Sequence, residues 1–272
     1  NLTITSTNYG IFEGNIIVTK EGGIPTITIN AESLVAAFDE IKNAQITNAN
    51  FVIKYNSTNT VQNYVSNYEN VGSFANALTN STLTNTSVSV EYKYKETGSG
   101  QFITNNNTNI GGIFGKVDGS TFTITEDSKE NVVYKVSNFS NWTLTLRQSE
   151  RDRKNINFGL FAGLVNNSKI SYLPFEVGGN TDIKVGVSNY NLTNVSVGGI
   201  IGQSISTSYP EFNLSTTNKL NVYLYTNSGV LIENAYVGGI FGKLLSAENS
   251  NSGQIGKISH IGSVYVGPVN ET

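Results

Sequence analysis

The sequence of 272 residues contains no cysteine and no methionine, and only one histidine. Without cysteine, neither a disulfide framework nor a thiolate metal site can form. Secretion stays open, because stacked repeats can supply the stability that small secreted domains take from disulfides. The chain begins at Asn1 rather than at methionine, and we interpret it as a processed or excised piece of a longer precursor.

Charge is scarce as well: 14% of the residues are charged, the formal net charge is -3 and the pI is about 5.3. This balance argues against nucleic acid or an anionic membrane as the partner. No segment approaches the length of a membrane span and nothing resembles a signal peptide, so no membrane insertion is expected. Because 38% of the residues are apolar and 10% aromatic, the chain should fold. With no composition break or proline-rich linker, a single elongated domain over residues 1–272 is the simplest organisation.

What the sequence has instead is a recurring glycine motif. Residues 237–243 read VGGIFGK, residues 110–116 read IGGIFGK and residues 197–203 read VGGIIGQ, with looser copies at 158–164, 71–77 and 9–15. Glycines around two large apolar residues suit a tight corner, where the apolar pair enters a shared core and another backbone comes close. The period is about 40 residues with two insertions. Aligned on the glycine before the apolar pair, the corners lie at Gly10, Gly72, Gly112, Gly159, Gly199 and Gly239.

The pattern changes once, between the first two corners. Asn30 could cap a helix over about residues 31–43, in which Leu34, Phe38 and Ile41 have helical spacing and two alanines favour the helix. We expect this helix to cover a sheet edge or the open end of the array.

The other segments alternate apolar and polar residues as strands do. Together with the corners they predict an all-β fold, a repetitive β-solenoid-like stack with one short amphipathic helix near the N-terminus. The alternative is an ordinary hairpin turn in a β-sandwich, but sandwich strands seldom repeat their residues in register. The expected strands are residues 2–7, 15–19, 26–29, 51–55, 87–94, 120–125, 142–146, 182–187, 221–225 and 263–266.

The VGGIFGK, IGGIFGK and VGGIIGQ corners, each followed by a polar strand and a turn, resemble the GLUG-type repeats of large secreted and surface-attached bacterial proteins. Residues 27–34 (ITINAESL), with the expected helix, also resemble the short helical segment that often accompanies such repeats. The resemblance covers most of the chain from about Val71 onward, although the period here is longer and the paired glycine is missing at Gly72 and Gly159. It implies a β-solenoid-like stack and an extracellular stalk, adhesin or fibre role.

No motif indicates catalysis or a cofactor. The single histidine, His260, lies in an alternating segment, and no GxSxG nucleophile motif accompanies it. A polysaccharide-acting β-helix enzyme, the weakest alternative, needs a carboxylate pair, whereas Asp and Glu here fall mostly in turns, as at 39–40, 126–127 and 248. There is no calcium-binding loop motif, and Asp118 and Asp182 are typical of turn formers. We therefore expect no enzyme activity, no cofactor and no metal site.

Every arginine of the chain lies within residues 147–154 (RQSERDRK), which coincide with one of the two insertions. We interpret this stretch as a projecting loop. It is either solvated and self-neutralised, or a contact loop whose arginine forks grip a carboxylate of a neighbouring subunit or an acidic glycan. The candidate contact residues are Arg147, Arg151 and Arg153.

The sequon N-x-S/T is mildly enriched. Attached sugars would give the stack a hydrated coat that compensates for its sparse charge. The alternative is that the sequons only reflect an asparagine-rich composition. The candidate N-glycosylation sites are Asn1, Asn56, Asn80, Asn85, Asn106, Asn138, Asn141, Asn166, Asn191, Asn194, Asn213 and Asn270.

These observations predict a non-enzymatic extracellular structural module of a surface stalk, adhesin or filament. The ends of a stacked array are natural sites for joining another copy, so the expected partners are other copies of the chain and attached or bound glycans. The alternative is a glycan- or host-protein-binding module. Exposed tyrosines on one face, such as Tyr92, Tyr94, Tyr223 and Tyr225, would favour it.

Overall fold

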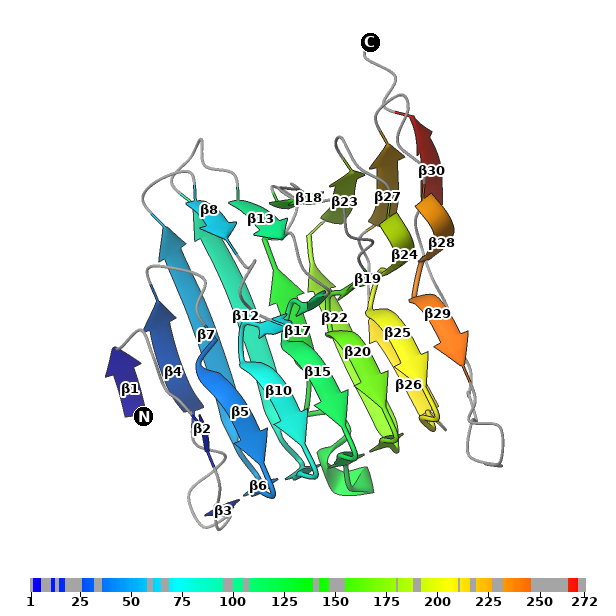
Figure 1. The fold of residues 1–272 in the computed structure, drawn as a ribbon. Helices are drawn as coiled ribbons and strands as arrows, with labels where there is room; N and C mark the ends of the chain where they lie inside the picture. Colours follow the sequence, from blue (N-terminus) through cyan, green and yellow to red (C-terminus); the bar gives the residue numbers. More distant parts are fainter. Residues whose placement is uncertain are drawn as a thin grey trace.

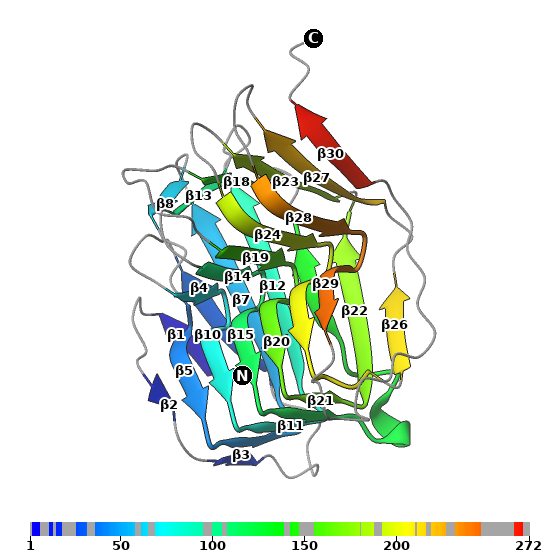
Figure 2. The ribbon, with the colours of Figure 1, turned by 45° about the vertical axis from the view of Figure 1, so that its right-hand side comes forward.

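The computed structural model describes residues 2–5, 11–12, 15–17, 26–31, 36–57, 61–64, 69–94, 100–104, 108–138, 142–146, 155–179, 181–187, 192–209, 211–215, 219–226, 232–245 and 264–268. They form an all-β, parallel solenoid of about four turns (Figures 1 and 2). Strands of successive turns pair in parallel along five sheets, here named A to E. The predicted solenoid-like stack is thereby confirmed.

Each complete turn passes through sheets B, C, A, D and E in that order. Sheet A contains β1 (Leu2–Thr5), β4 (Thr26–Ala31), β7 (Asn50–Ser57), β12 (Ser87–Tyr94), β17 (Tyr134–Ser137), β22 (Tyr172–Gly178) and β26 (Glu211–Ser215). Sheet B contains β2 (Ile11–Phe12), β5 (Phe38–Lys42), β10 (Ala75–Thr79), β15 (Phe114–Asp118), β20 (Ala162–Asn166), β25 (Ile201–Ile205) and β29 (Phe241–Leu245). Sheet C contains β3 (Asn15–Ile17), β6 (Gln45–Thr47), β11 (Thr82–Thr84), β16 (Thr121–Thr123) and β21 (Lys169–Ile170).

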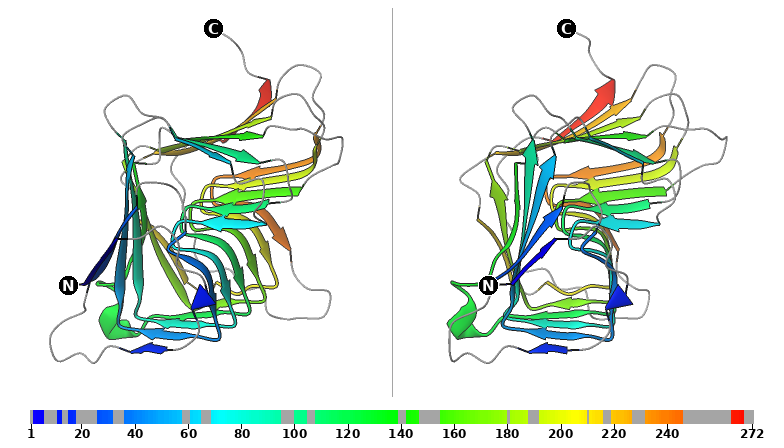
Figure 3. Two further views of the ribbon diagram at one scale, coloured as in Figure 1. Left: turned by 60° about the vertical axis from the view of Figure 1, so that its left-hand side comes forward. Right: turned by 90° about the vertical axis from the view of Figure 1, so that its left-hand side faces the viewer.

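Sheet D contains β8 (Val61–Tyr64), β13 (Gly100–Thr104), β18 (Trp142–Leu146), β23 (Thr181–Val187), β27 (Leu220–Thr226) and β30 (Val264–Pro268). Sheet E contains β9 (Asn70–Gly72), β14 (Thr108–Gly111), β19 (Asn155–Gly159), β24 (Leu192–Gly198) and β28 (Ile232–Gly238). Figure 3 looks nearly along the column: sheets A and B face each other, sheet C closes that half, and sheets D and E form the other half. The expected strands at 87–94 and 142–146 coincide with β12 and β18.

The core consists of inward side chains that stack from turn to turn. In sheet B, Leu78, Val117 and Val165 pair in register and are fully buried. Beside them, the rings of Phe74, Phe114 and Phe161 meet edge to face, with centroid distances of 5.7 Å and 5.4 Å. Burying each such side chain stabilises the fold by roughly 1.5–3 kcal/mol, so each turn depends on the turns above and below it.

The corner between sheets E and B requires the first glycine of the repeated pair. A Cβ on Gly111 would lie 1.7 Å from the carbonyl oxygen of Phe114. The register sets Gly111 opposite Gly72 and Gly159, and Gly198 opposite Gly238. The predicted alignment on Gly112, Gly199 and Gly239 is therefore wrong by one residue, and the position after the required glycine holds Ser73 or Leu160 in other turns.

The copy at residues 9–15 does not belong to this series. Ile11 pairs with Glu40, which pairs with Ala77 rather than with Ser73, the residue that follows Gly72. Gly10 itself lies outside the described residues. The apparent gap between Gly10 and Gly72 contains a complete turn that begins at β5 and ends at β9.

The helix expected over residues 31–43 is not present. Asn30 and Ala31 end strand β4, and β5 begins at Phe38, while residues 32–35 lie outside the described part. Ala36 and Ala37 are buried at the corner before β5, where they take the positions of Ser73 and Phe74 of the next turn, and the backbone N–H groups of Ala37 and Phe38 donate to the carbonyl oxygens of Ser73 and Phe74 at 3.1 Å and 3.0 Å. Alanine favours helices, but it is also small enough for a corner where a neighbouring backbone comes close. Composition alone could not distinguish the two structures, which explains the error. The one helical element among the described residues is the 3₁₀ turn η1 (Glu126–Ser128).

Asparagine has a structural role at the corner between sheets B and C. One residue per turn adopts a positive φ there, and asparagine tolerates that conformation better than other side-chain-bearing residues. The column consists of Asn43 (φ 50°), Asn80 (φ 47°), Gly119 (φ 59°), Asn167 (φ 45°) and Ser206 (φ 50°). Asparagine thus serves the fold at three of the five positions of this column.

A ladder of buried hydroxyl groups follows this corner. The backbone N–H groups of Ser81 and Ser120 donate to the Oγ atoms of Ser120 and Ser168, each at 3.1 Å, and the N–H of Ser168 donates to Oγ1 of Thr207 at 3.4 Å. Each hydroxyl also donates to the carbonyl oxygen two residues before it. The ladder satisfies backbone groups that would otherwise be buried without partners.

Candidate binding surfaces

The outer face of sheet D carries two tyrosines at one end of the column. Leu220, Val222 and Leu224 of β27 point inward and are fully buried, so the alternating residues Tyr223 and Tyr225 lie on the outer face, where they are partly exposed. Their rings are stacked, with centroids 5.6 Å apart and an interplanar angle of 8°. The strand alternation holds the two rings in this arrangement.

Polar side chains of the neighbouring strand β23 adjoin this pair. Asn221 donates a hydrogen bond from Nδ2 to Oδ1 of Asp182 at 2.8 Å, and Nζ of Lys184 lies 4.0 Å from Oδ2 of Asp182. In register, Lys184 is opposite Tyr223. The pKa of Tyr223 is raised, first by partial desolvation and then by the negative charge of Asp182.

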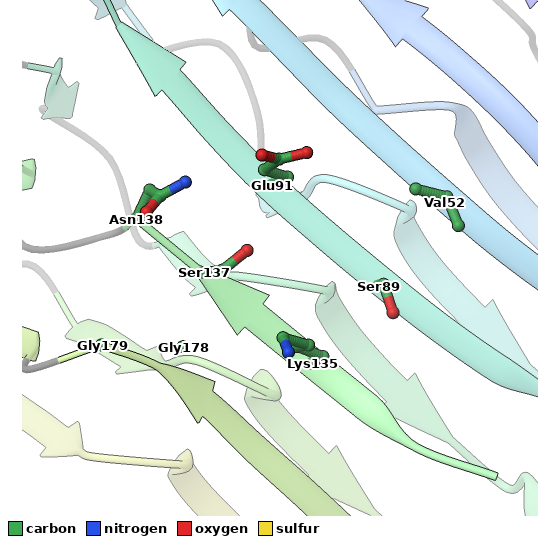
Figure 4. A pocket seen from close by; sticks show the side chains of 8 residues that line it. All are labelled: Val52, Ser89, Glu91, Lys135, Ser137, Asn138, Gly178 and Gly179. Atoms are coloured by element: carbon green, nitrogen blue, oxygen red, sulfur yellow. The ribbon is translucent and has the colours of Figure 1, made fainter. Parts of the chain in front are cut away.

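A shallow depression of about 530 Å³ lies on the outer face of sheet A (Figure 4). The charged residues at its surface are Glu91 and Lys135, and Lys135 forms an ion pair with Glu176 of the next strand. The depression lies where several residues at the outer positions of sheet A have small side chains or none. Its lining residues are Val52, Ser89, Glu91, Lys135, Ser137, Asn138, Gly178 and Gly179, none of which is aromatic.

Sheet E presents ladders of side-chain amides. Nδ2 of Asn109 donates to Oδ1 of Asn70 at 2.8 Å, and Nδ2 of Asn157 donates to Oδ1 of Asn109 at 2.8 Å. Asn194 donates in the same way to Asn155 at 2.7 Å. These amides hydrogen bond along the column, so they stabilise the stacking of turns.

The structure separates the four tyrosines that the sequence grouped. Tyr92 is fully buried: its hydroxyl lies 2.7 Å from Oγ of Ser73 and donates to the carbonyl oxygen of Gly112 at 3.2 Å. Tyr94 ends β12, and its side chain is outside the described part. Tyr223 and Tyr225 form an outer pair. The parity of β12 could have shown this, because Tyr92 alternates in phase with the buried Val88 and Val90.

The sequon asparagines lie in different surroundings. Asn80 and Asn138 are exposed and have positive φ, at 47° and 60°. Asn85 is buried, and its Oδ1 accepts a hydrogen bond from the N–H of Thr125 at 2.9 Å. Asn166 donates to Asp118 at 3.0 Å, and Asn194 to Asn155. Asn56 and Asn213 lie in β7 and β26 with undescribed side chains, and Asn1, Asn106, Asn141, Asn191 and Asn270 lie outside the described residues.

Other predicted residues have simple surroundings or fall outside the described ranges. Asp118 pairs with Lys116 at 2.8 Å in the same strand. Arg147, Arg151, Arg153, Glu248 and His260 lie outside the described residues. Within the described part of the chain, no group of three or more histidine or acidic residues is arranged to hold a metal ion. Nor does that part contain a helix with the length and hydrophobicity needed to cross a lipid bilayer.

No protein-family model, no curated protein and no solved structure matches this chain at a significant level. The resemblance to GLUG-type repeats therefore depends on short sequence motifs alone. The geometry of the corners and columns establishes the repeat fold, and the function has to be argued from the surfaces described above.

Proposed function

We propose that this chain is a non-enzymatic structural module of an extracellular stalk, adhesin or filament, built from GLUG-type repeats and joined end to end with further copies of itself. The observation that carries the proposal is the exposure of core columns at the C-terminal end. Leu244 continues the inward column of sheet B, opposite the buried Ser204, yet is 46% exposed. Val264 continues the inward column of sheet D, opposite the buried Val222, and is 45% exposed.

The backbone supports the same proposal. β28, β29 and β30 are edge strands of sheets E, B and D. An edge strand beside exposed apolar side chains is a template for one more parallel strand. Leu245, on the same strand as Leu244, adds a further apolar side chain that is 40% exposed.

A second copy of the chain is the occupant that fits this edge. Its N-terminal end presents edge strands of the same five sheets, namely β1, β2, β3, β8 and β9. Because every turn runs in the same direction, the N-terminal edge of one copy matches the C-terminal edge of another in strand order and in strand sense. Joining the two would continue the hydrophobic columns and produce a rod of greater length.

Extracellular placement belongs to this proposal and is supported by the GLUG resemblance. The exposed sequons at Asn80 and Asn138 would allow attached glycans to project from the column.

Sedimentation velocity over a wide concentration range tests the end-to-end contact. We expect the chain to associate reversibly, and we expect Leu244→Glu combined with Leu245→Glu to abolish association. Leu164→Glu is the matched control, because Leu164 lies on β20 in the middle of sheet B and is partly exposed there. A chain that stays monomeric at every concentration, or that associates equally well with both end leucines changed, would contradict the proposal.

The second candidate function is a glycan-binding module. It is favoured by the stacked Tyr223–Tyr225 pair with its polar neighbours.

A further inference from the structure

We propose that the outer face of sheet D around Tyr223 and Tyr225, here called the tyrosine face, binds a neutral oligosaccharide. This inference goes beyond the structural role, and it does not depend on whether copies of the chain join end to end. The tyrosine face is defined by Asp182, Lys184, Asn221, Tyr223 and Tyr225.

The pair of tyrosines, rather than a single tyrosine, distinguishes β27 from the other strands of sheet D. In the row of Tyr223, the register partners are Tyr265 on one side and Lys184 and then Thr143 on the other. In the row of Tyr225, they are Gly267 on one side and Gly186, Thr145, Ile103 and Tyr64 on the other. Single tyrosines therefore recur in these rows, but among the described strands of sheet D only β27 has an aromatic residue at both positions. If the pair were needed for stacking, other turns would have it too, as they have the corner glycines.

The row of Tyr225 gives the surface its shape. Gly186 of β23 and Gly267 of β30 are the register partners of Tyr225 on its two sides. Since glycine has no side chain, neither neighbouring strand places one against the ring in this row. A ligand that lies flat against the ring of Tyr225 would therefore meet no side chain from these two positions.

The chemistry of the tyrosine face suits a sugar. A pyranose ring has an apolar C–H face that packs on an aromatic ring and hydroxyl groups around its rim that need hydrogen-bond partners. Asp182 offers carboxylate oxygens that accept hydrogen bonds from hydroxyls, and the hydroxyls of the two tyrosines can donate or accept. Asn221 and Lys184 hold the carboxylate in place, at 2.8 Å and 4.0 Å.

The charge balance favours a neutral ligand. Asp182 and Lys184 are of opposite sign and lie beside each other, so the tyrosine face has no excess charge for an acidic glycan. Aromatic packing and hydroxyl contacts remain as the recognition elements, which are those of a neutral hexose chain.

The test is isothermal titration calorimetry of the full chain with cellohexaose, maltohexaose, mannohexaose and N-acetylglucosamine hexamer, with hexagalacturonate as the acidic probe. We expect weak but saturable binding of at least one neutral probe, and at least about a tenfold loss of affinity for Tyr223→Ala and for Tyr225→Ala. Asp182→Asn should weaken binding less, because it keeps the acceptor oxygen. The control is Tyr236→Ala, which removes a partly exposed tyrosine from sheet E. Its ring centroid lies 4.2 Å from Nζ of Lys243. This substitution should leave binding unchanged.

Three results would overturn the inference. These are no heat with any neutral probe, binding that survives the loss of both tyrosines, or binding of hexagalacturonate alone. Circular dichroism of each variant establishes that the column is folded. Because the leucine variants at the C-terminal end should bind the neutral probe normally, failure of end joining and failure of sugar binding are separate outcomes.

Discussion

The interior of the column and its C-terminal end have apolar residues at the same inward positions, but these residues are buried to different extents. Leu78, Val117 and Val165 are 0% exposed, whereas Leu244, further along their column in sheet B, is 46% exposed. The corners before Val117 and Leu244 are also alike, IGGIFGK in the interior and VGGIFGK at the end. Burial in this fold is therefore provided by the next turn rather than within a turn.

The shape of the corner, by contrast, is local. A Cβ on Gly238 would meet the carbonyl oxygen of Phe241, in the same corner, at 2.0 Å, much as one on Gly111 would meet that of Phe114 at 1.7 Å. Only the interior glycine also meets the next turn, at the Cα of Ala162, 3.0 Å away. The end turn can thus form its corner without contacts to a further turn, whereas its apolar side chains stay partly exposed.

The largest expected effect is a difference between two identical substitutions in one column. Leu78→Ala removes a fully buried side chain that is covered on both sides, and should lower the free energy of unfolding by about 2–5 kcal/mol. Leu244→Ala should lower it by less than about 1 kcal/mol, because that side chain is already largely in water. Urea denaturation at low protein concentration measures both. Equal losses would mean that the C-terminal end is covered in solution.

A smaller effect should separate two tyrosines inside the column. Tyr92→Phe removes the hydroxyl that joins Ser73 to Gly112, in the corners of successive turns, and leaves two buried polar groups without it. The free energy of unfolding should fall by about 1–3 kcal/mol.

Tyr134 is the matched control for Tyr92. It is also buried, and among the described residues no hydrogen bond reaches its hydroxyl, while its ring packs on Phe122 and Phe161 at 5.8 Å and 5.4 Å. Tyr134→Phe should therefore leave stability unchanged or raise it by up to about 1 kcal/mol. If both substitutions destabilise the chain equally, the hydrogen bonds of Tyr92 are not what distinguishes the two sites.

The sequence predicted the stack because the corner is a local feature. Glycine before an apolar pair, and the alternation in segments such as residues 87–94, require no knowledge of neighbouring turns. Register was harder to predict: in a Gly-Gly pair, either glycine can be aligned, and only the pairing of Gly111 with Gly72 and Gly159 in the neighbouring turns decides between them. The alanine corner at Ala36 and Ala37 was misread for the same reason, since its partners are carbonyl oxygens one turn away.

The surfaces could be predicted only in part. The alternation along each strand shows which residues point inward and which outward, and it separates Tyr92 from Tyr223 and Tyr225. The pairing of Asp182 with Asn221 was not, because it depends on two residues that meet only through the register of β23 and β27. Asparagine gave an ambiguous signal, because a corner with positive φ, an amide ladder and a glycosylation sequon all use the same residue.

The weakest expected contrast concerns pH. Burial raises the pKa of Tyr134 and of Tyr209 well above the usual range for tyrosine, despite the hydrogen bonds that Tyr209 makes. In the unfolded chain both would ionise near pH 10. A raised folded-state pKa means that stability is intact below about pH 10 and falls as the pH rises further, by about 1.4 kcal/mol per pH unit for each such tyrosine. Urea midpoints measured from neutral to strongly alkaline pH should show a shallower fall for Tyr134→Phe than for the unmodified chain. Lysine titration is common to both proteins, so identical slopes would show that Tyr134 ionises without unfolding the column.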